Sequence, residues 1–256
     1  MDRATLLGFL LGIGLLAVAI LVGPNPKIFL EWKSLMVVFG GIIASTLIRF
    51  PLGSVAFAFK VASRAFFTHP VSPQQVVMQV VGLSQRARRE GLKAMEKHLP
   101  DDPFLAQGLQ MAIDRIDRER IREVLTAEIQ STQERHHQGQ EIFRFIAASA
   151  PSFGMVGTLI GMVQLFASIN KPSEMGGAMA LSLLSTLWGA VVAYLFAIPI
   201  SGKLELRSRE EAQTKHLLLE GILGIAAESH PGQLEEHLNA FLAPKAKIRR
   251  MGGGAA

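Results

Sequence analysis

The sequence contains no cysteine among its 256 residues, and charged side chains are scarce. Without cysteine, the chain forms neither disulfides nor thiolate metal sites. Asp, Glu, Lys and Arg make up 18% of the residues, below the roughly one quarter found in a typical soluble domain. The deficit is concentrated in four blocks that have no charged residue: Ala4–Val22, Ser34–Ile48, Phe145–Asn170 and Met175–Ser201. This distribution is typical of a membrane protein.

Enzyme signatures are also missing. None of the seven histidines belongs to an HExxH pair or lies in a charge-free block, and the chain has neither a Walker loop nor a dinucleotide fingerprint. We therefore expect a protein that is not an enzyme and that needs no cofactor or resident metal. The basic residues alternate with acids and have no stacking aromatics among them, which argues against nucleic-acid binding.

The charge-free blocks predict four membrane helices. A spanning helix needs ~20 apolar residues to cross a hydrocarbon core of ~30 Å, and the first, third and fourth blocks meet this requirement. The second block, Ser34–Ile48, is shorter. Its flanking residues, Trp32 and Lys33 before it and Arg49 and Phe50 after it, can reach the membrane interface.

The distribution of basic residues predicts the orientation. An even number of spans puts both termini on the same side, and loops rich in Lys and Arg stay in the cytoplasm. The segment 49–144 and the C-terminal tail carry most of the basic residues near the membrane, whereas the opposite loops offer only Lys27, Lys33 and Lys171. Both termini and the large loop are therefore expected in the cytoplasm.

The predicted fold is an all-α membrane protein with four transmembrane helices. A helical cytoplasmic domain lies between spans 2 and 3, and spans 3 and 4 have long cytoplasmic extensions. The expected boundaries are 1–50 for the first two spans, 51–144 for the cytoplasmic domain, 145–202 for the last two spans, 203–243 for the C-terminal helices and 244–256 for a disordered basic tail.

Capping signals predict individual helices outside the spans. Ser72 before Pro73, with Gln75 three positions after Ser72, reads as a partial capping box. Asp102 is expected to cap a helix that runs from Pro103 to about Ile116. A long helix should follow Asp117 through Glu141 into the third span, the fourth span shows no breaker between Gly202 and Glu228, and a last helix is expected over Pro231–Leu242. The aromatic and basic stretch Phe57–Phe67 either continues the second span or lies along the membrane interface.

Two threonines stand near the middle of the third and fourth blocks, Thr158 and Thr186. A hydroxyl in a membrane helix usually bonds a carbonyl of its own helix and does nothing else. Two hydroxyls at similar depth could also line an ion path, because each can replace a water of a sodium ion or join a proton-conducting water chain. Neither holds a cation without a negative charge nearby, and no acid lies in these blocks. The pattern predicts an obligate partner that supplies the carboxylate.

Prolines and glycines mark the same two blocks. Pro151 and Pro199 each remove a helix hydrogen bond and free a carbonyl, which indicates either a plain kink or a hinge between membrane and cytoplasm. Gly154, Gly157 and Gly161 have the spacing that lets helices approach closely, within one chain or between subunits.

The densest run of charges is Arg86–Lys97. On a helix, Arg89, Lys93 and Lys97 would stack along one face at i, i+4 and i+8. Such a run is either a solvated face or a docking site for a charged partner, where exposed charges tune encounter and register.

Together these parts resemble the MotA/PomA family, the A subunit of the bacterial flagellar stator. The resemblance runs from the first residue to about 242, and its most specific stretches are Glu134–Val163, which contains the motif APxxGMxGTLxGM in the form APSFGMVGTLIGM, and Ala178–Leu204. It implies a membrane complex of five A subunits around two B subunits. The B subunit, MotB-like or PomB-like, would carry the ion-binding aspartate that this chain lacks.

The resemblance also implies roles for particular residues. Thr158 and Thr186 would line the ion path, and Pro151 and Pro199 would take part in conformational coupling. The residues that would face the rotor protein FliG are Arg88, Arg89 and Glu96, with Lys93 and Lys97 as further candidates.

The transported ion, Na+ or H+, stays open. Thr158 favours sodium, since proton-type members often have a small apolar residue there, but Ala148 stands where some sodium-type relatives place an acid. The alternative function is an ExbB/TolQ-type energiser of outer-membrane processes. Proteins of that type usually have three spans, so whether the short second block crosses the membrane distinguishes the two functions. A passive scaffold without an ion role is a third reading.

Overall fold

A computed structural model describes residues 3–67 and 71–242. Every regular element within these ranges is a helix, and they contain no β-strand, which confirms the predicted all-α fold. The basic tail predicted at 244–256 lies outside the described residues.

Among the described residues, four stretches of helix are long and apolar enough to cross a membrane, in agreement with the four predicted from the sequence. They lie within Ala4–Leu21, Pro26–Arg49, Arg118–Ala167 and Pro172–Ala226. The second stretch, where the sequence signal is shortest, gains length because a 3-10 helix, η1 (Pro26–Leu30), precedes α2 (Trp32–Arg49).

The helices pack into two units, which are described separately. Unit 1 is built from residues up to 67 together with 135–206, and unit 2 from residues 71–134 together with 207–242. Besides η1 and α2, unit 1 contains α1 (Arg3–Leu21), α3 (Leu52–Phe67), part of α6 (Arg118–Ala167), α7 (Pro172–Ala190), a π-helical turn labelled η3 (Val191–Ala197) and the start of α8 (Ile198–Ala226).

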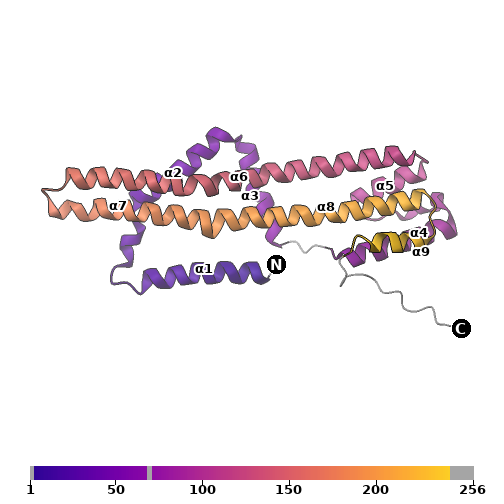
Figure 1. The fold of residues 1–256 in the computed structure, drawn as a ribbon, viewed down its shortest axis with the longest axis horizontal. Helices are drawn as coiled ribbons and strands as arrows, with labels where there is room; N and C mark the ends of the chain where they lie inside the picture. The colour runs from indigo at the N-terminus through magenta and orange to yellow at the C-terminus, as the bar shows by residue number, and fades with distance from the viewer. Residues whose placement is uncertain (1–2, 68–70, 243–256) are drawn as a thin grey trace. The chain divides into compact units, whose positions relative to one another are not determined.

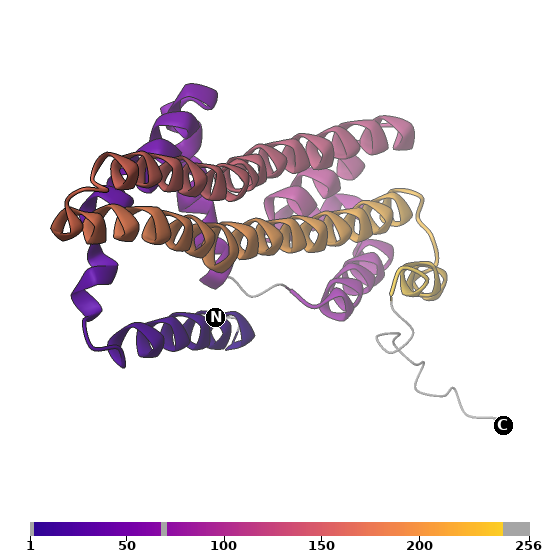
Figure 2. The same ribbon diagram turned by 60° about the vertical axis from the view of Figure 1, so that its left-hand side comes forward.

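In unit 1, α6 and α7 lie side by side (Figure 1). Val38 and Ile42 of α2 pack with Ala150 of α6 and Ala193 of η3 in a small apolar core. By contrast, no residue of the apolar stretch of α1 is buried, and Figure 2 shows this helix, in indigo, apart from the paired α6 and α7. Its Phe9 nevertheless reaches Phe196, with 5.9 Å between the ring centroids. Most of the surface of α1 is therefore free to contact lipid or other chains.

The helix α3 does not continue the second span. Phe50 takes an extended conformation (φ −124, ψ 142) because the residue before a proline is disfavoured in the α region, and Pro51 therefore separates α2 from α3. The buried side of α3, Ala58 and Ala62, packs on Phe143 of α6 and Leu204 of α8. Small side chains on α3 let it approach these two helices closely.

Unit 2 has its own core. It contains α4 (Pro73–Glu90), a 3-10 helix η2 (Leu92–His98), α5 (Pro103–Ile113), α9 (Pro231–Asn239) and the remaining parts of α6 and α8. Leu105, Ile121, Leu125 and Ile222 are among its fully buried residues. Ile121 and Leu125 thus turn one face of α6 into this core.

The predicted helix starts are confirmed in unit 2. Ser72 and Gln75 form a reciprocal capping box, with both hydrogen bonds 3.3 Å long. Asp102 accepts a hydrogen bond of 2.8 Å from the backbone N–H of Leu105. The ends are less accurate: α5 stops at Ile113 rather than Ile116, because Arg115 adopts a positive φ of 56. The helix after Asp117 runs unbroken into the third span, as predicted.

The prediction that Arg89, Lys93 and Lys97 share one helical face is wrong. The helix α4 ends at Glu90, and Gly91 has φ 85, a conformation that only glycine adopts without strain. Lys93 and Lys97 lie beyond it on η2, where residues repeat every three positions instead of every 3.6.

Candidate functional site

Thr158 of α6 and Thr186 of α7 lie in direct contact. Their Oγ1 atoms are 2.6 Å apart, a short hydrogen bond in which either hydroxyl can donate. The Thr158 hydroxyl is also 3.1 Å from the carbonyl oxygens of Gly154 and Ser182. A hydroxyl has one proton, so when Thr158 donates to a carbonyl, Thr186 donates to Thr158. The bond within the helix and the contact between helices therefore coexist.

The threonine pair is part of a polar seam between α6 and α7. The Ser182 hydroxyl donates to the carbonyl of Thr158 at 3.1 Å, with that of Ala178 as a second acceptor at 3.2 Å. Ser185 is fully buried and donates to Leu181 at 2.7 Å. Sequence reasoning missed both serines, although Ser182, Ser185 and Gly189 repeat at the spacing of one helical face.

The three glycines of the third span lie along this seam. A Cβ on Gly154 would come within 3.0 Å of the Ser185 carbonyl oxygen and 3.2 Å of the Thr186 Cα. A Cβ on Gly157 would overlap the Ser185 side chain, and one on Gly161 would overlap that of Ser182. Glycine at these positions allows α7 to approach close enough for the two threonines to touch.

This seam supplies neutral oxygens only. Neither charge-free block that forms it contains an acid, and no cluster of three or more acidic or histidine residues suited to a metal ion occurs among the described residues. Thr186 is exposed in the single chain, whereas Thr158 is partly buried. A carboxylate on a neighbouring molecule could therefore approach the pair from the Thr186 side.

Pro199 lies two positions after the last residue of the π-helical turn, Ala197. Within this turn, the N–H of Ile198 donates to the carbonyl of Ala193, five residues earlier. Proline has no N–H, and its ring would clash with the carbonyl four residues before it. The wider π turn accommodates the ring of Pro199, and sequence reasoning did not anticipate this turn. Pro151 lies inside α6, which continues through it.

Arginines and glutamates meet just outside the charge-free blocks. Arg144 donates to Glu141 at 3.2 Å and to Glu205 at 2.8 Å, and these two hydrogen bonds, that with Glu141 first, raise the pKa of the Arg144 guanidinium. Arg49 lies 3.9 Å from Glu141 and 4.8 Å from the ring centroid of Phe145. The cluster ties the end of α2 and the beginning of α8 to the middle of α6. Sequence reasoning used these arginines only to orient the chain.

The charged candidates of unit 2 are all exposed. Arg88 and Arg89 belong to the last turn of α4, and Lys93, Glu96 and Lys97 to η2. Met95 lies on η2 between Lys93 and Glu96, and its burial in the core of unit 2 anchors this helix. The five side chains therefore form two short charged groups on either side of Gly91.

Comparison with known proteins places this geometry in context. Residues 96–216 match the MotA/TolQ/ExbB proton channel family. The chain is 33% identical over 242 residues to the chemotaxis protein PomA of Vibrio alginolyticus, covering 94% of this chain and 96% of that protein. It is 31% identical over 249 residues to motility protein A of Treponema phagedenis, covering 96% of each.

A solved structure has the same fold. The chain superposes on a chain of the flagellar MotAB stator complex from Bacillus subtilis with a TM-score of 0.87 and 27% identity, covering 98% of this chain and 100% of that one.

Proposed function

The chain belongs to the motility protein A family, within the MotA/TolQ/ExbB proton channel proteins, and we propose that it is the A subunit of an ion-driven flagellar stator. It would work with a B subunit to convert an ion gradient into torque on the rotor. The observation that carries the proposal is the Thr158–Thr186 pair, held between the charge-free parts of α6 and α7 without a carboxylate of its own.

The two subunits would divide the chemistry. The B subunit supplies one aspartate in the membrane, and this chain supplies hydroxyl and carbonyl oxygens around it. An arriving Na+ or H+ neutralises the aspartate, which can then move past the A subunits because a neutral group is cheaper to shift in an apolar environment. One charge that crosses ~100 mV releases ~2.3 kcal/mol, enough to drive such a step.

The assembly would place five copies of this chain around two B subunits in the bacterial inner membrane. Residues 51–144 and both termini would lie in the cytoplasm, consistent with the basic residues that cluster there. Spans at 1–50 and 145–202 would form the membrane part, with helices at 203–243 extending into the cytoplasm. Pro151 and Pro199 would couple the membrane part to the cytoplasm, and Gly154, Gly157 and Gly161 would set the distance between helices.

The rotor contact would use the charged groups on either side of Gly91. Arg88, Arg89 and Glu96 would face FliG, with Lys93 and Lys97 beside them. All five are exposed, as such a contact requires. Exposed charges contribute to encounter and register more than to affinity, which suits a partner that must be released at every step.

A motility assay tests the proposal. The chain and a cognate B subunit are expressed together in a motile strain that lacks its own stator, and swimming speed is measured. We expect the pair to restore swimming and neither subunit alone to do so. Normal motility with the Pro199→Leu variant, or with the partner aspartate changed to Asn, would contradict the scheme.

A further inference from the structure

Ser182 of α7 and Thr158 of α6 are joined by two hydrogen bonds that run in opposite directions across the seam. The Thr158 hydroxyl reaches the Ser182 carbonyl oxygen at 3.1 Å, and the Ser182 hydroxyl reaches the Thr158 carbonyl oxygen at 3.1 Å. A displacement of α7 along α6 by one residue, about 1.5 Å, would disrupt the geometry of both bonds at once. The reciprocal pair therefore sets the register of the two helices.

Each hydroxyl of this pair also has an acceptor in its own helix. Thr158 can donate to the carbonyl of Gly154 at 3.1 Å, and Ser182 to that of Ala178 at 3.2 Å. Hydroxyls in membrane helices usually make only such a bond. Ser182 differs because it is packed against α6: it is 8% exposed, and a Cβ on Gly161 would overlap its hydroxyl. The Ser182 hydroxyl thus lies against the backbone of α6 and offers no surface to a passing ion.

The contact between the two threonines depends on this register. Thr186 follows Ser182 by four positions and therefore shares its helix face. Its hydroxyl is 2.6 Å from that of Thr158, whereas the nearest acceptor in its own helix, the Ser182 carbonyl oxygen, lies at 3.5 Å. If α7 moved along α6, Thr186 would lose the short bond and turn to the carbonyl of its own helix. The two threonine oxygens would then no longer lie side by side.

We propose that Ser182 is a positioning residue of the ion path: its hydroxyl holds α6 and α7 in register, so that Thr158 and Thr186 present their oxygens to the ion together. This inference rests on the proposed function, which assigns the two threonines to the ion path. Ser182 itself is buried and contacts neither the ion nor the partner carboxylate. Loss of its hydroxyl weakens the affinity of the path for the driving ion and leaves the steps that follow ion binding unchanged.

Swimming speed measured against the concentration of the driving ion tests this role, with the full chain and its B subunit in a strain that lacks its own stator. Sodium is varied at fixed pH, and pH at fixed sodium. Ser182→Ala should raise the half-saturating concentration of the driving ion by about threefold, the scale of one hydrogen bond between membrane helices. The maximal speed and the amount of complex in the membrane should stay near those of the parent.

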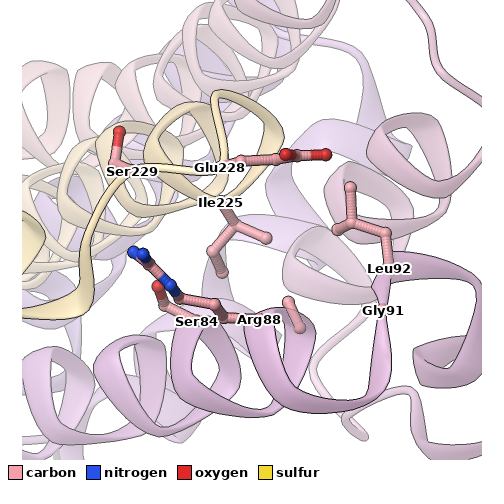
Figure 3. Close-up of a pocket in the computed structure, with 8 residues that line it drawn as sticks. Ser84, Arg88, Gly91, Leu92, Ile225, Glu228 and Ser229 are labelled. Atoms are coloured by element: carbon pink, nitrogen blue, oxygen red, sulfur yellow. The ribbon is translucent and has the colours of Figure 1, made fainter.

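Two other serines provide matched controls. The hydroxyl of Ser45 on α2 donates to the carbonyl of Ile42 in its own helix at 3.1 Å, so Ser45→Ala removes a membrane hydroxyl outside the seam. Ser84 of α4 is 4% exposed and lies in unit 2, where it lines a pocket with Arg88 (Figure 3), so Ser84→Ala removes a hydroxyl that is buried as deeply as that of Ser182. Both control variants should keep the half-saturating ion concentration of the parent.

The outcomes separate this inference from the proposed function. If the parent restores swimming and Ser182→Ala keeps the parent's half-saturating concentration, the inference is wrong and the function stands. A Ser182→Ala variant that only lowers the maximal speed or the amount of complex, or that swims at no ion concentration, would assign the serine to packing and also overturn the inference. An equal shift in both control variants would do the same. If the parent complex forms but restores no swimming, the proposed function itself fails.

Discussion

At the scale of single residues, the candidate site depends on two hydroxyls and on the absence of side chains beside them. The threonine pair needs both the hydrogen bond of 2.6 Å and the close approach that Gly154 and Gly157 permit. The sequence predicts the threonines and the glycines, but their contact depends on the tertiary pairing of α6 with α7. Ser182 and Ser185 were missed because one uncharged helix offers no sign of which face meets its neighbour.

Replacing the hydroxyl of Thr186 tests its role directly. Thr186→Val keeps the shape but removes the oxygen, and we expect ion-driven swimming to fall by about tenfold or more, as the loss of one ion-facing polar group implies. Thr186→Ser keeps the hydroxyl and serves as the control, with near-parent swimming. Equal swimming speeds for the Val and Ser variants would remove Thr186 from the ion path.

Adding a side chain at Gly157 tests the seam. A Cβ there would overlap Ser185, so Gly157→Val should destabilise the chain by about 1–3 kcal/mol through overpacking. Gly176→Val is the matched control, because nothing lies within 4 Å of a Cβ at that position. Thermal unfolding of the complex in detergent measures the difference, and an unchanged midpoint for Gly157→Val would show that α7 can move away freely.

At the scale of elements, capping residues and helix-breaking residues determine how well the sequence predicts where each helix starts and ends. The capping box at Ser72 and the cap at Asp102 were predicted because a few neighbouring residues determine them. The stacking of Arg89, Lys93 and Lys97 that a helix would give is not observed, because α4 ends at Glu90 and Gly91 has a positive φ, which the charge spacing does not reveal. The π turn was not predicted for a similar reason. Its hydrogen bonds depend on the backbone conformation of the residues before Pro199, which the sequence pattern does not indicate.

Pro199 provides a test at this scale. Pro199→Ala restores an N–H that can bond the carbonyl four residues earlier, which favours a regular α-helix over the π turn. We expect swimming to fall while co-purification with the B subunit is retained. Pro172→Ala is the control, because proline at the first turn of α7 replaces no hydrogen bond. Parent-like swimming for Pro199→Ala would assign the π turn to packing alone.

At the scale of the whole molecule, composition predicted more than any motif. Four charge-free blocks predict four spans, and the described part of the chain contains four helices of sufficient length and apolarity. The division into two packing units could not be predicted in the same way, because α6 and α8 each contribute to both units without a break in sequence. The sequence pattern also does not determine the transported ion, because a threonine hydroxyl serves a sodium ion or a water chain equally well.

Swimming speed measured against external sodium at fixed pH decides the ion. If sodium drives the complex, speed should rise with sodium and saturate, and a proton uncoupler should have little immediate effect. If protons drive it, speed should be independent of sodium and should collapse with the uncoupler. A strain that carries a stator of known ion preference serves as the control, and a complex that responds to neither treatment would contradict an ion-driven motor.

The π turn at Val191–Ala197 has a further consequence, for helical phase. It holds about one residue more than the 3.6 of an α turn, so it rotates the face that follows by roughly 100° compared with an uninterrupted α-helix. Ser201 and Leu204 are buried in unit 1, and the rotation introduced by the π turn is what directs these two side chains inward. Deleting a single residue from the turn would leave the span equally apolar, yet would rotate both side chains away from their neighbours. One surplus residue thus acts as an angular spacer between the span and the first turns of α8.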